Sequence, residues 1–376
     1  MKSPRPTSNS LLHLPLNFSL RSWLRRKREN FLGILRELGE NVGYNTAIMI
    51  ISRTPLRISF AGGGSDLPAY FSHEPGAVVG TAINKYIYIT VNKKFDNRIR
   101  ASYSITEFVD KPRELKHELI REALGLLEID GGIEITSISD IPSSGTGLGS
   151  SSTYTVGLLN ALYAFQGKWV SPEKIASEAC HIEIDLCKKP IGKQDQYLAA
   201  YGGFNYMQFD PDGRVRVEPL ICRKETRDRI QNNLLLLYTG INRSADKILK
   251  VQNRETINNG KKKKILRRMV ELAADLKKAV EKNQAETFGE ILDANWELKK
   301  QMAEGISNGR IDEWYKIAKR NGAVGGKILG AGGGGFLLLY APRENHDRIC
   351  EGLPELKRIP FAFEPEGSKI IYFGEK

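Results

Sequence analysis

The glycine-rich stretch between residues 140 and 153 contains the residue types that bind phosphate groups. Its candidate phosphate-binding residues are Gly145, Gly147, Leu148, Gly149, Ser150, Ser151 and Ser152. Apolar residues with helical spacing follow at 156–162, so the loop is predicted to lead directly into a helix. The free N–H groups of a first helical turn attract anions, and serine hydroxyls can bind phosphate oxygens or magnesium. The stretch therefore predicts a site for the phosphates of a nucleotide.

Two further glycine clusters occur far from this loop in the sequence, at residues 62–64 and 332–335. Glycine inside a regular element costs about 0.5–1 kcal/mol relative to alanine, so such runs are unfavourable unless a ligand must approach the backbone. Three clusters in one chain favour a shared ligand over unrelated tight turns. The loop is not a Walker A motif, because no Gly-Lys-Ser/Thr follows the glycines. It is not a Rossmann fingerprint either, because the acidic residues that follow have a helical pattern.

Charged residues that could act on a hydroxyl group lie in other segments. Asp195 follows a Gly-Lys-Gln sequence, and an ionised aspartate can accept a proton from an attacking hydroxyl. Glu183 could bind magnesium together with a serine hydroxyl, although Asp185 competes for that role. Arg57 has a planar guanidinium that suits a carboxylate or a phosphate. Taken alone, each of these residues could equally be structural: a helix-facing carboxylate, or an arginine paired to a surface acid.

The three glycine clusters, in this order, resemble the three motifs of the GHMP kinase superfamily, which includes galactokinase, homoserine kinase and mevalonate kinase. The resemblance covers about residues 50–376. It implies ATP as the co-substrate and Mg²⁺ as the cofactor, with Ser151 and Glu183 as the metal ligands. It also implies that Asp195 is the catalytic base and that Arg57 is the cation beside it, because phosphoryl transfer depends on positioning and charge stabilisation.

The expected substrate-binding residues begin with the first glycine cluster. Galactokinases have Gly-Glu-His-Thr-Asp where this chain has Gly62-Gly-Gly-Ser-Asp66, so the aspartate is retained and two bulky side chains are absent. Asp66 is expected to bind a sugar hydroxyl, and Gly63 and Gly64 leave room for a larger sugar. Lys193 and Arg243 are candidates to bind a phosphate that the substrate already carries. The remaining candidates are Tyr238, Gly333 and Gly334.

Within the superfamily, these segments are most similar to sugar 1-kinases of the GDP-heptose pathway. The expected reaction is phosphorylation of the anomeric hydroxyl of D-glycero-D-manno-heptose 7-phosphate to the 1,7-bisphosphate, for surface glycan synthesis. A fucokinase, or another GHMP sugar kinase, is the alternative, and a mevalonate-type specificity fits the segments less well. An inactive nucleotide-binding or nucleic-acid-binding protein is a remote alternative, against which the retained Asp195, Arg57, Ser151 and Glu183 argue.

Composition is compatible with an enzyme that binds anions. The net charge of +12 suits ATP and a sugar phosphate, and nucleic acid is not expected because no clustered basic and aromatic motif accompanies the charge. The four cysteines are scattered, without zinc-site or disulfide spacing, which favours a cytoplasmic protein. The sequence contains no stretch of about 20 apolar residues, so no membrane span is expected. A homodimer is left open.

The predicted fold class is α+β, because helices and strands are mixed without strict alternation. Residues 1–48 are interpreted as a basic extension, either disordered or upstream of a natural start at Met49, with an interaction arm as the alternative. Residues 49–220 and 221–376 are expected to form two lobes. By resemblance, the first is similar to ribosomal protein S5 domain 2 and the second is ferredoxin-like. Strands are expected at 51–60, 78–93, 132–137, 206–217, 234–238, 327–340 and 369–373, and helices at 116–127, 149–166, 172–187 and 244–320.

Overall fold

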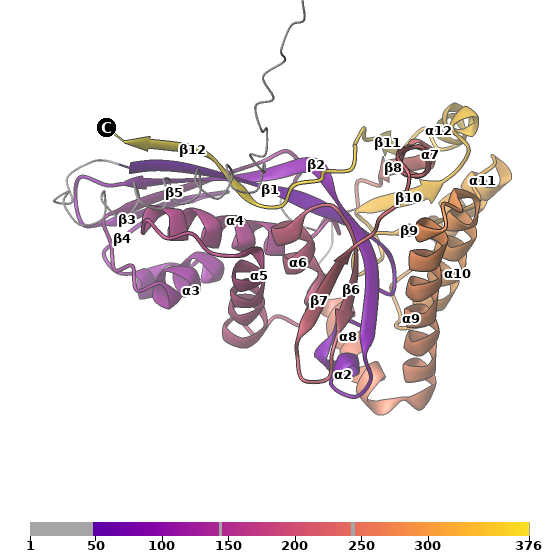
Figure 1. Cartoon of the computed structure of the whole chain (residues 1–376), viewed down its shortest axis with the longest axis horizontal. Coiled ribbons are helices and arrows are strands. Elements are labelled where there is room, and N and C mark those ends of the chain that lie inside the picture. Colours follow the sequence, from indigo (N-terminus) through magenta and orange to yellow (C-terminus); the bar gives the residue numbers. More distant parts are fainter. Residues whose placement is uncertain (1–47, 143–144, 242–244, 376) are drawn as a thin grey trace, which may run out of the picture. The chain divides into compact units, whose positions relative to one another are not determined.

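The computed structural model describes residues 48–142, 145–241 and 245–375. Residues 47–376 form one compact unit, to which all the elements below belong. The expected extension 1–48 lies outside the described residues, except for its last residue, which begins the first strand. The fold consists of one mixed sheet, one antiparallel sheet and the helices that pack on them (Figure 1).

The larger sheet has eight strands, and its main path runs in the order β12-β1-β2-β5-β3-β4; off this path, β6 pairs with β2, and β7 pairs with β6. All neighbouring strands are antiparallel except β3 and β5, which are parallel. The strands are β1 (Ile48–Ala61), β2 (Gly76–Lys93), β3 (Ile99–Ser102), β4 (Thr106–Val109), β5 (Ile133–Ser139), β6 (Phe204–Phe209), β7 (Val215–Pro219) and β12 (Lys369–Glu375).

The two halves of the long strand β2 pair with different strands of this sheet. Its first half, from Gly76 to Thr81, pairs with β6, and its second half, from Ile87 to Lys93, pairs with β5. The first half is buried on both faces, whereas the second alternates between buried and partly exposed residues. An alternating pattern is typical of a strand with one face on the core. Its neighbour β1 follows β2 along both halves, with register shifts after Pro55 and after Ser59.

The smaller sheet has four antiparallel strands in the order β11-β8-β10-β9. They are β8 (Leu234–Tyr238), β9 (Gly325–Ile328), β10 (Phe336–Tyr340) and β11 (Lys357–Arg358). β8 and β10 are continuous apolar runs, as expected for strands covered on both faces. A cluster around Trp296 and Trp314 packs against this sheet, and a larger cluster lies beneath the eight-stranded sheet.

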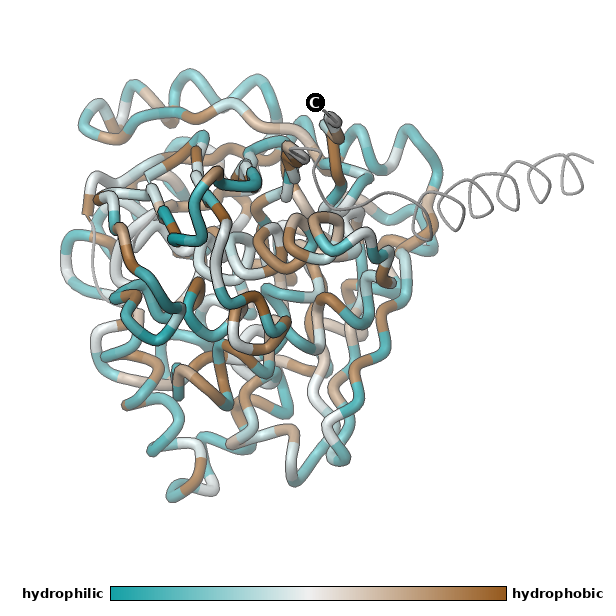
Figure 2. The backbone as a smooth tube through the Cα atoms, turned by 90° about the vertical axis from the view of Figure 1, so that its left-hand side faces the viewer, coloured by the Kyte–Doolittle hydropathy of each residue, from teal (hydrophilic) through white to brown (hydrophobic). Residues whose placement is uncertain are grey.

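The helices cover one face of each sheet in Figure 1, with α3, α4 and α5 below the larger sheet and α9 and α10 below the smaller one. α4 packs directly on β1 and β2. In Figure 2, hydrophilic residues predominate along the outer helices and loops. The helices are α2 (Pro68–Phe71), α3 (Glu118–Leu126), α4 (Ser150–Phe165), α5 (Pro172–Cys180), α6 (Gln194–Tyr201), α7 (Lys224–Asn233), α8 (Ala245–Asn258), α9 (Gly260–Glu281), α10 (Phe288–Lys300), α11 (Gly309–Arg320) and α12 (His346–Gly352).

The predicted α+β class is confirmed, and two local expectations change. The single helix expected over 172–187 is α5 followed by a π-helix, η2 (His181–Leu186). The final strand, β12, was expected with the second lobe but pairs antiparallel with β1 in the larger sheet. The reason is that residues 359–368 run from the smaller sheet back past β2, where Phe363 forms a bridge with Ile83. Among the described helices, none is long and apolar enough to cross a membrane.

Candidate functional site

One cleft brings together segments from both sheets. It has a volume of about 610 Å³ and is lined by the glycine loop before α4, the first glycine cluster, the start of α6 and the last glycine cluster. Most of the residues expected from the sequence contribute to this lining. They are Arg57, Gly63, Gly64, Asp66, Gly145, Gly147, Gly149, Ser150, Ser151, Ser152, Glu183, Asp195 and Gly334.

The loop before α4 requires its glycines. Gly145, Gly147 and Gly149 have φ angles of +71°, +77° and +78°, a region that other residues rarely adopt. At Gly147, a Cβ atom would also lie 2.4 Å from the carbonyl oxygen of Leu329, just before the last glycine cluster. Gly149 is the N-cap of α4 and makes no side-chain capping bond. The N–H groups of the first turn, beginning at Ser150, can therefore donate to the oxygens of a phosphate.

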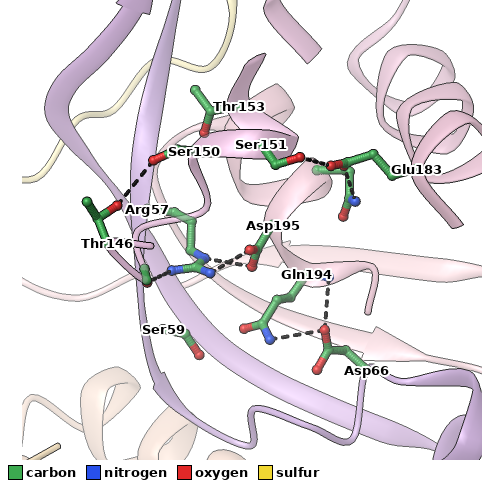
Figure 3. Close-up of polar contacts among 12 residues, drawn as sticks. Arg57, Ser59, Asp66, Thr146, Ser150, Ser151, Thr153, Glu183, Gln194 and Asp195 are labelled. Carbon is green, nitrogen blue, oxygen red and sulfur yellow. Dashed lines mark hydrogen bonds and ion pairs between the residues drawn. The ribbon is translucent and has the colours of Figure 1, made fainter. Parts of the chain in front are cut away.

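Arg57 in β1 forms a bidentate ion pair with Asp195 in the first turn of α6 (Figure 3). Nε donates to Oδ1 at 2.6 Å and Nη2 donates to Oδ2 at 2.5 Å. Nη1 donates to the carbonyl oxygen of Gly147 at 2.7 Å, and the backbone N–H donates to the carbonyl oxygen of Leu148 at 3.2 Å. The Leu148 side chain is itself fully buried. Arg57 thus joins the carboxylate to the glycine loop, and the bidentate geometry holds both in one orientation.

Glu183 lies beneath the start of α4 and is fully buried. Ser151 Oγ donates to its Oε1 at 2.5 Å, and Gln196 Nε2 donates to its Oε2 at 2.6 Å. Burial raises the pKa of this carboxyl to about 7, although hydrogen bonds from Ser151 and other side chains oppose the shift. A hydroxyl and a carboxylate at this point suit Mg²⁺, which takes oxygen ligands from one or two protein groups together with phosphates. Accordingly, no cluster of three or more metal-binding side chains is found in the described ranges.

Glu183 and its competitor, Asp185, both lie in the π-helix η2 but have different partners. Asp185 has a 62 % exposed side chain and pairs with His181 Nδ1 at 2.9 Å, away from the cleft. A π-helix is wider than an α-helix, and single π turns often occur at functional sites. Residues two positions apart point to opposite sides of either kind of helix, so Glu183 contacts Ser151 and Asp185 does not. Regular helical spacing from the sequence did not predict the π-helix.

Asp66 is a second buried carboxylate in the cleft, on the opposite side of α6 from the Glu183 pair. Its Oδ1 accepts from the Gly64 N–H at 2.8 Å, and its Oδ2 accepts from Gln194 Nε2 at 3.0 Å. Burial raises its pKa. Two nearby side-chain oxygens, Ser59 Oγ and Gln194 Oε1, are buried and have no hydrogen-bond partner among the described residues. Both residues line the cleft, so this region can accept and donate hydrogen bonds to a polar ligand.

Other expected substrate residues lie elsewhere. Lys193 donates to the carbonyl oxygen of Gly213 at 2.6 Å and lies over the Phe71 ring, outside the cleft lining. The Tyr238 ring packs 5.1 Å from that of Phe336. Gly333 donates its N–H to Ile306 and, unlike Gly334, is not among the lining residues. Arg243 lies outside the described residues.

Three lysines that sequence analysis did not select also line the cleft. Lys189 pairs with Glu118 at 2.9 Å, and the other two are buried. Lys327 Nζ donates to the carbonyl oxygens of Ser59 and Phe60, at 2.9 and 3.2 Å. Lys299 Nζ donates to Gln252 Oε1 at 2.9 Å. Burial lowers the pKa of Lys327 to about 7 and that of Lys299 to about 8. The position of Lys327 just before the last glycine cluster was an available signal, whereas Lys299 appears in the sequence as an ordinary helix lysine.

Residues 115–203 match the family model for the GHMP kinases N terminal domain, and residues 276–358 match that for GHMP kinases C terminal. The D-glycero-alpha-D-manno-heptose 7-phosphate kinase of Campylobacter jejuni is 31% identical over 334 residues, covering 85% of this chain and 98% of the relative. The bifunctional fucokinase/GDP-fucose pyrophosphorylase of Arabidopsis thaliana is 26% identical over 311 residues, covering 76% of this chain and 29% of the relative.

Among solved structures, a D-glycero-D-manno-heptose 1-phosphate kinase from Bacteroides thetaiotaomicron is similar with a TM-score of 0.71 and 25% identity. The match covers 86% of this chain and 99% of that one. A galactokinase from Lactococcus lactis in complex with galactose, at 16% identity and a TM-score of 0.68, shares the fold.

Proposed function

Because the chain belongs to the GHMP kinase family, we propose that this ATP-dependent phosphotransferase phosphorylates the anomeric hydroxyl of D-glycero-D-manno-heptose 7-phosphate. The observation that carries the proposal is the bidentate pair of Arg57 and Asp195. Arg57 also donates a hydrogen bond to Gly147, which connects this pair to the glycine loop. In this proposal Asp195 is the base, and it lies beside the helix N-terminus at which phosphate would bind. The reaction would occur in the cytoplasm, where ATP is available.

The phosphates of ATP are proposed to bind the loop 145–149 and the first turn of α4. The N–H groups there, the hydroxyls of Ser150 and Ser152, and the helix dipole all favour negative charge. Ser151 and Glu183 are the proposed protein ligands of Mg²⁺, which when bound neutralises charge on the phosphates. Ser151 and Glu183 fit that role because both present oxygen atoms at the edge of the phosphate site.

Asp195 is the proposed base. As the sugar hydroxyl oxygen forms its bond to the γ-phosphorus, the hydroxyl proton moves to an Asp195 oxygen and the bond between the γ-phosphorus and the bridging oxygen breaks, releasing ADP. Arg57 fixes the direction of the carboxylate and places positive charge next to the transferred group. Because its guanidinium also binds the Gly147 carbonyl, base and phosphate loop move as one unit.

The sugar is proposed to lie between Asp195 and the first glycine cluster. Asp66, Ser59 and Gln194 offer hydrogen bonds to its hydroxyls, and Gly63 and Gly64 leave space beside them. The choice of a heptose 7-phosphate is supported by the similarity to the Campylobacter jejuni relative, which extends over nearly the whole of that protein. Lys193 is not included, because its ammonium group already donates to Gly213.

A fucokinase is the second candidate, because a plant protein with that activity is 26% identical over most of this chain. An assay of ADP release with a panel of acceptors separates the candidates. The panel contains D-glycero-D-manno-heptose 7-phosphate, the free heptose, L-fucose, galactose and mevalonate. We expect the highest kcat/KM with the heptose 7-phosphate and no turnover of galactose. A preference for L-fucose or another free sugar would refute the heptose specificity and leave only a sugar kinase.

A further inference from the structure

The cleft contains two buried lysines that have no carboxylate within ion-pair distance among the described residues. Lys299 and Lys327 are 6 % and 4 % exposed, and neither forms an ion pair within 4.0 Å with a described residue. Burying an ammonium group without a counter-charge is costly, and this cost is usually avoided by pairing or by losing the proton. Two such groups in one cleft therefore require a reason beyond packing.

Four carboxylates line the same cleft, and one of them, Asp246 in the first turn of α8, acts on Lys189 and not on the two buried lysines. Asp195 is held by Arg57, and Glu183 accepts from Ser151 and Gln196. Asp66 is the acid whose charge acts on both lysines, but its oxygens accept from Gly64 and Gln194. The lysines consequently leave this part of the cleft with an excess of positive charge and hydrogen-bond donors.

The donors of Lys299 are less occupied than those of Lys327. An ammonium group has three N–H donors, and Lys299 uses one of them on Gln252 Oε1, whereas Lys327 uses two on backbone carbonyls. Since an ammonium can only donate, this contact also defines the orientation of the Gln252 amide. Gln252 Nε2 is then a buried donor with no partner among the described residues. The Lys299–Gln252 pair therefore presents donors and no free acceptor, which is the complement of a phosphate group.

The pair lies beside the first glycine cluster. A Cβ atom on Gly64 would lie 3.5 Å from Lys299 Nζ and 2.4 Å from Gln252 Nε2. Gly64 in turn donates to Asp66, which is bound by Gln194, the residue before Asp195. Asp66 and Gly64 therefore connect the proposed base with Lys299. This arrangement suits a substrate that has its reacting hydroxyl at one end and a charged group at the other.

We propose that Lys299, oriented by Gln252 and supported by Lys327, binds the phosphate group that the sugar already carries. This subsite rests on the proposed function, because it assigns the group that recognises the 7-phosphate of the heptose. The bound dianion supplies the counter-charge that the two ammonium groups lack, and Gly64 provides the space between Asp66 and the lysine. Specificity for a phosphorylated sugar then arises from two buried cations contributed by α10 and β9.

The test compares Lys299→Met with Lys300→Met. Methionine keeps the length of the lysine stem and removes only its charged end. Lys300 is the next residue on α10 but pairs with Glu297 outside the cleft, so its variant is a matched control. For each enzyme, kcat/KM is measured with D-glycero-D-manno-heptose 7-phosphate and with the free heptose, and the KM for ATP is measured in parallel. Binding of the heptose 7-phosphate without ATP is measured by calorimetry.

We expect Lys299→Met to reduce the preference for the phosphorylated sugar by about 10- to 100-fold, the effect of one charge-assisted contact. Its dissociation constant for the heptose 7-phosphate should increase by a similar factor, with the KM for ATP unchanged. Lys300→Met should behave as the wild type. If Lys299→Met does not fold, Lys299→Gln keeps a polar group beside Gln252 and removes the charge, and the same loss of preference is expected.

Two results would overturn the subsite, and they differ from failure of the proposed function. A wild type that prefers the heptose 7-phosphate, together with a Lys299→Met variant that keeps this preference, refutes the subsite alone. Weakened binding of ATP and of both sugars to the same extent would make Lys299 structural. A wild type that uses the free heptose and its 7-phosphate equally well refutes the proposed substrate, and the phosphate subsite with it.

Discussion

The Glu183→Gln variant should be more stable than the wild type in the absence of metal, and the difference should grow with pH. Glu183 is fully buried, and its carboxyl pKa is raised from 4.5 to about 7, mainly by loss of hydration. The folded protein therefore holds this proton more tightly than the unfolded chain does. Between pH 4.5 and about 7, the contribution of Glu183 to the free energy of unfolding must fall as pH rises.

The size of the effect follows from the shift. One pKa unit corresponds to about 1.4 kcal/mol. Above pH 7, where Glu183 is ionised, the free energy of unfolding of the wild type should therefore be about 3 kcal/mol lower than when Glu183 is protonated. Glutamine removes the titration and can be accommodated. Gln196 Oε1 has no partner among the described residues, so after rotation of the Gln196 amide it can accept from the new side-chain amide. The Ser151 hydroxyl can still donate to the remaining carbonyl oxygen.

The assay is urea unfolding in the presence of EDTA at pH 5, 6, 7 and 8, followed by tryptophan fluorescence. The gain in the free energy of unfolding for Glu183→Gln should increase from near zero at pH 5 to about 3 kcal/mol at pH 8. Glu271→Gln is the control, because its half-exposed carboxyl pairs with Arg268, whose guanidinium stays charged from pH 5 to pH 8, so the difference should change little. A gain for Glu183→Gln that stays the same from pH 5 to pH 8 would refute the reasoning. So would a loss of stability that increases with pH.

Three further variants test the proposed catalytic and phosphate groups. Asp195→Asn should lower kcat by about 10²–10⁴-fold while ATP binding measured by calorimetry is retained; a kcat near that of the wild type would reduce Asp195 to a positioning residue. Ser151→Ala should increase the magnesium concentration needed for half-maximal activity by about tenfold, whereas Asp185→Asn should not; the reverse pattern would move the ligand to Asp185. Gly147→Ala should lower both the melting temperature and ATP affinity, because the residue has a φ of +77° and its Cβ would meet the Leu329 carbonyl; unchanged values would show that the loop adapts.

The local sequence determined the part of the site that depends on backbone conformation, which is the glycine loop and the start of α4. Gly145, Gly147 and Gly149 had to precede a helix that begins at Ser150, because only glycine adopts these positive φ angles without strain. The ordering of glycines, serines and apolar residues is read along the chain, so it predicted the loop and the helix start. The α+β class followed in the same way, from the short-range periodicity of each segment.

Long-range packing decided the rest of the site. Glu183 and Asp185 are two residues apart and chemically similar, and the packing of their segment against α4 determines which of them reaches Ser151. Lys193 follows the glycine of its motif directly but is held by Gly213 in the β6–β7 turn. Lys299 lies in an ordinary helical sequence and reaches the cleft because α10 packs between the two sheets.

The physical reason is that the charge state and role of a side chain depend on its burial and its partners, which segments far apart in the sequence provide. The pairing of Arg57 with Asp195 joins residues 138 positions apart, and Lys327 contacts a carbonyl 268 positions away. A sequence specifies which residues can bind a carboxylate or a phosphate. Tertiary structure determines which of them lose their water, and therefore which are available to the substrate.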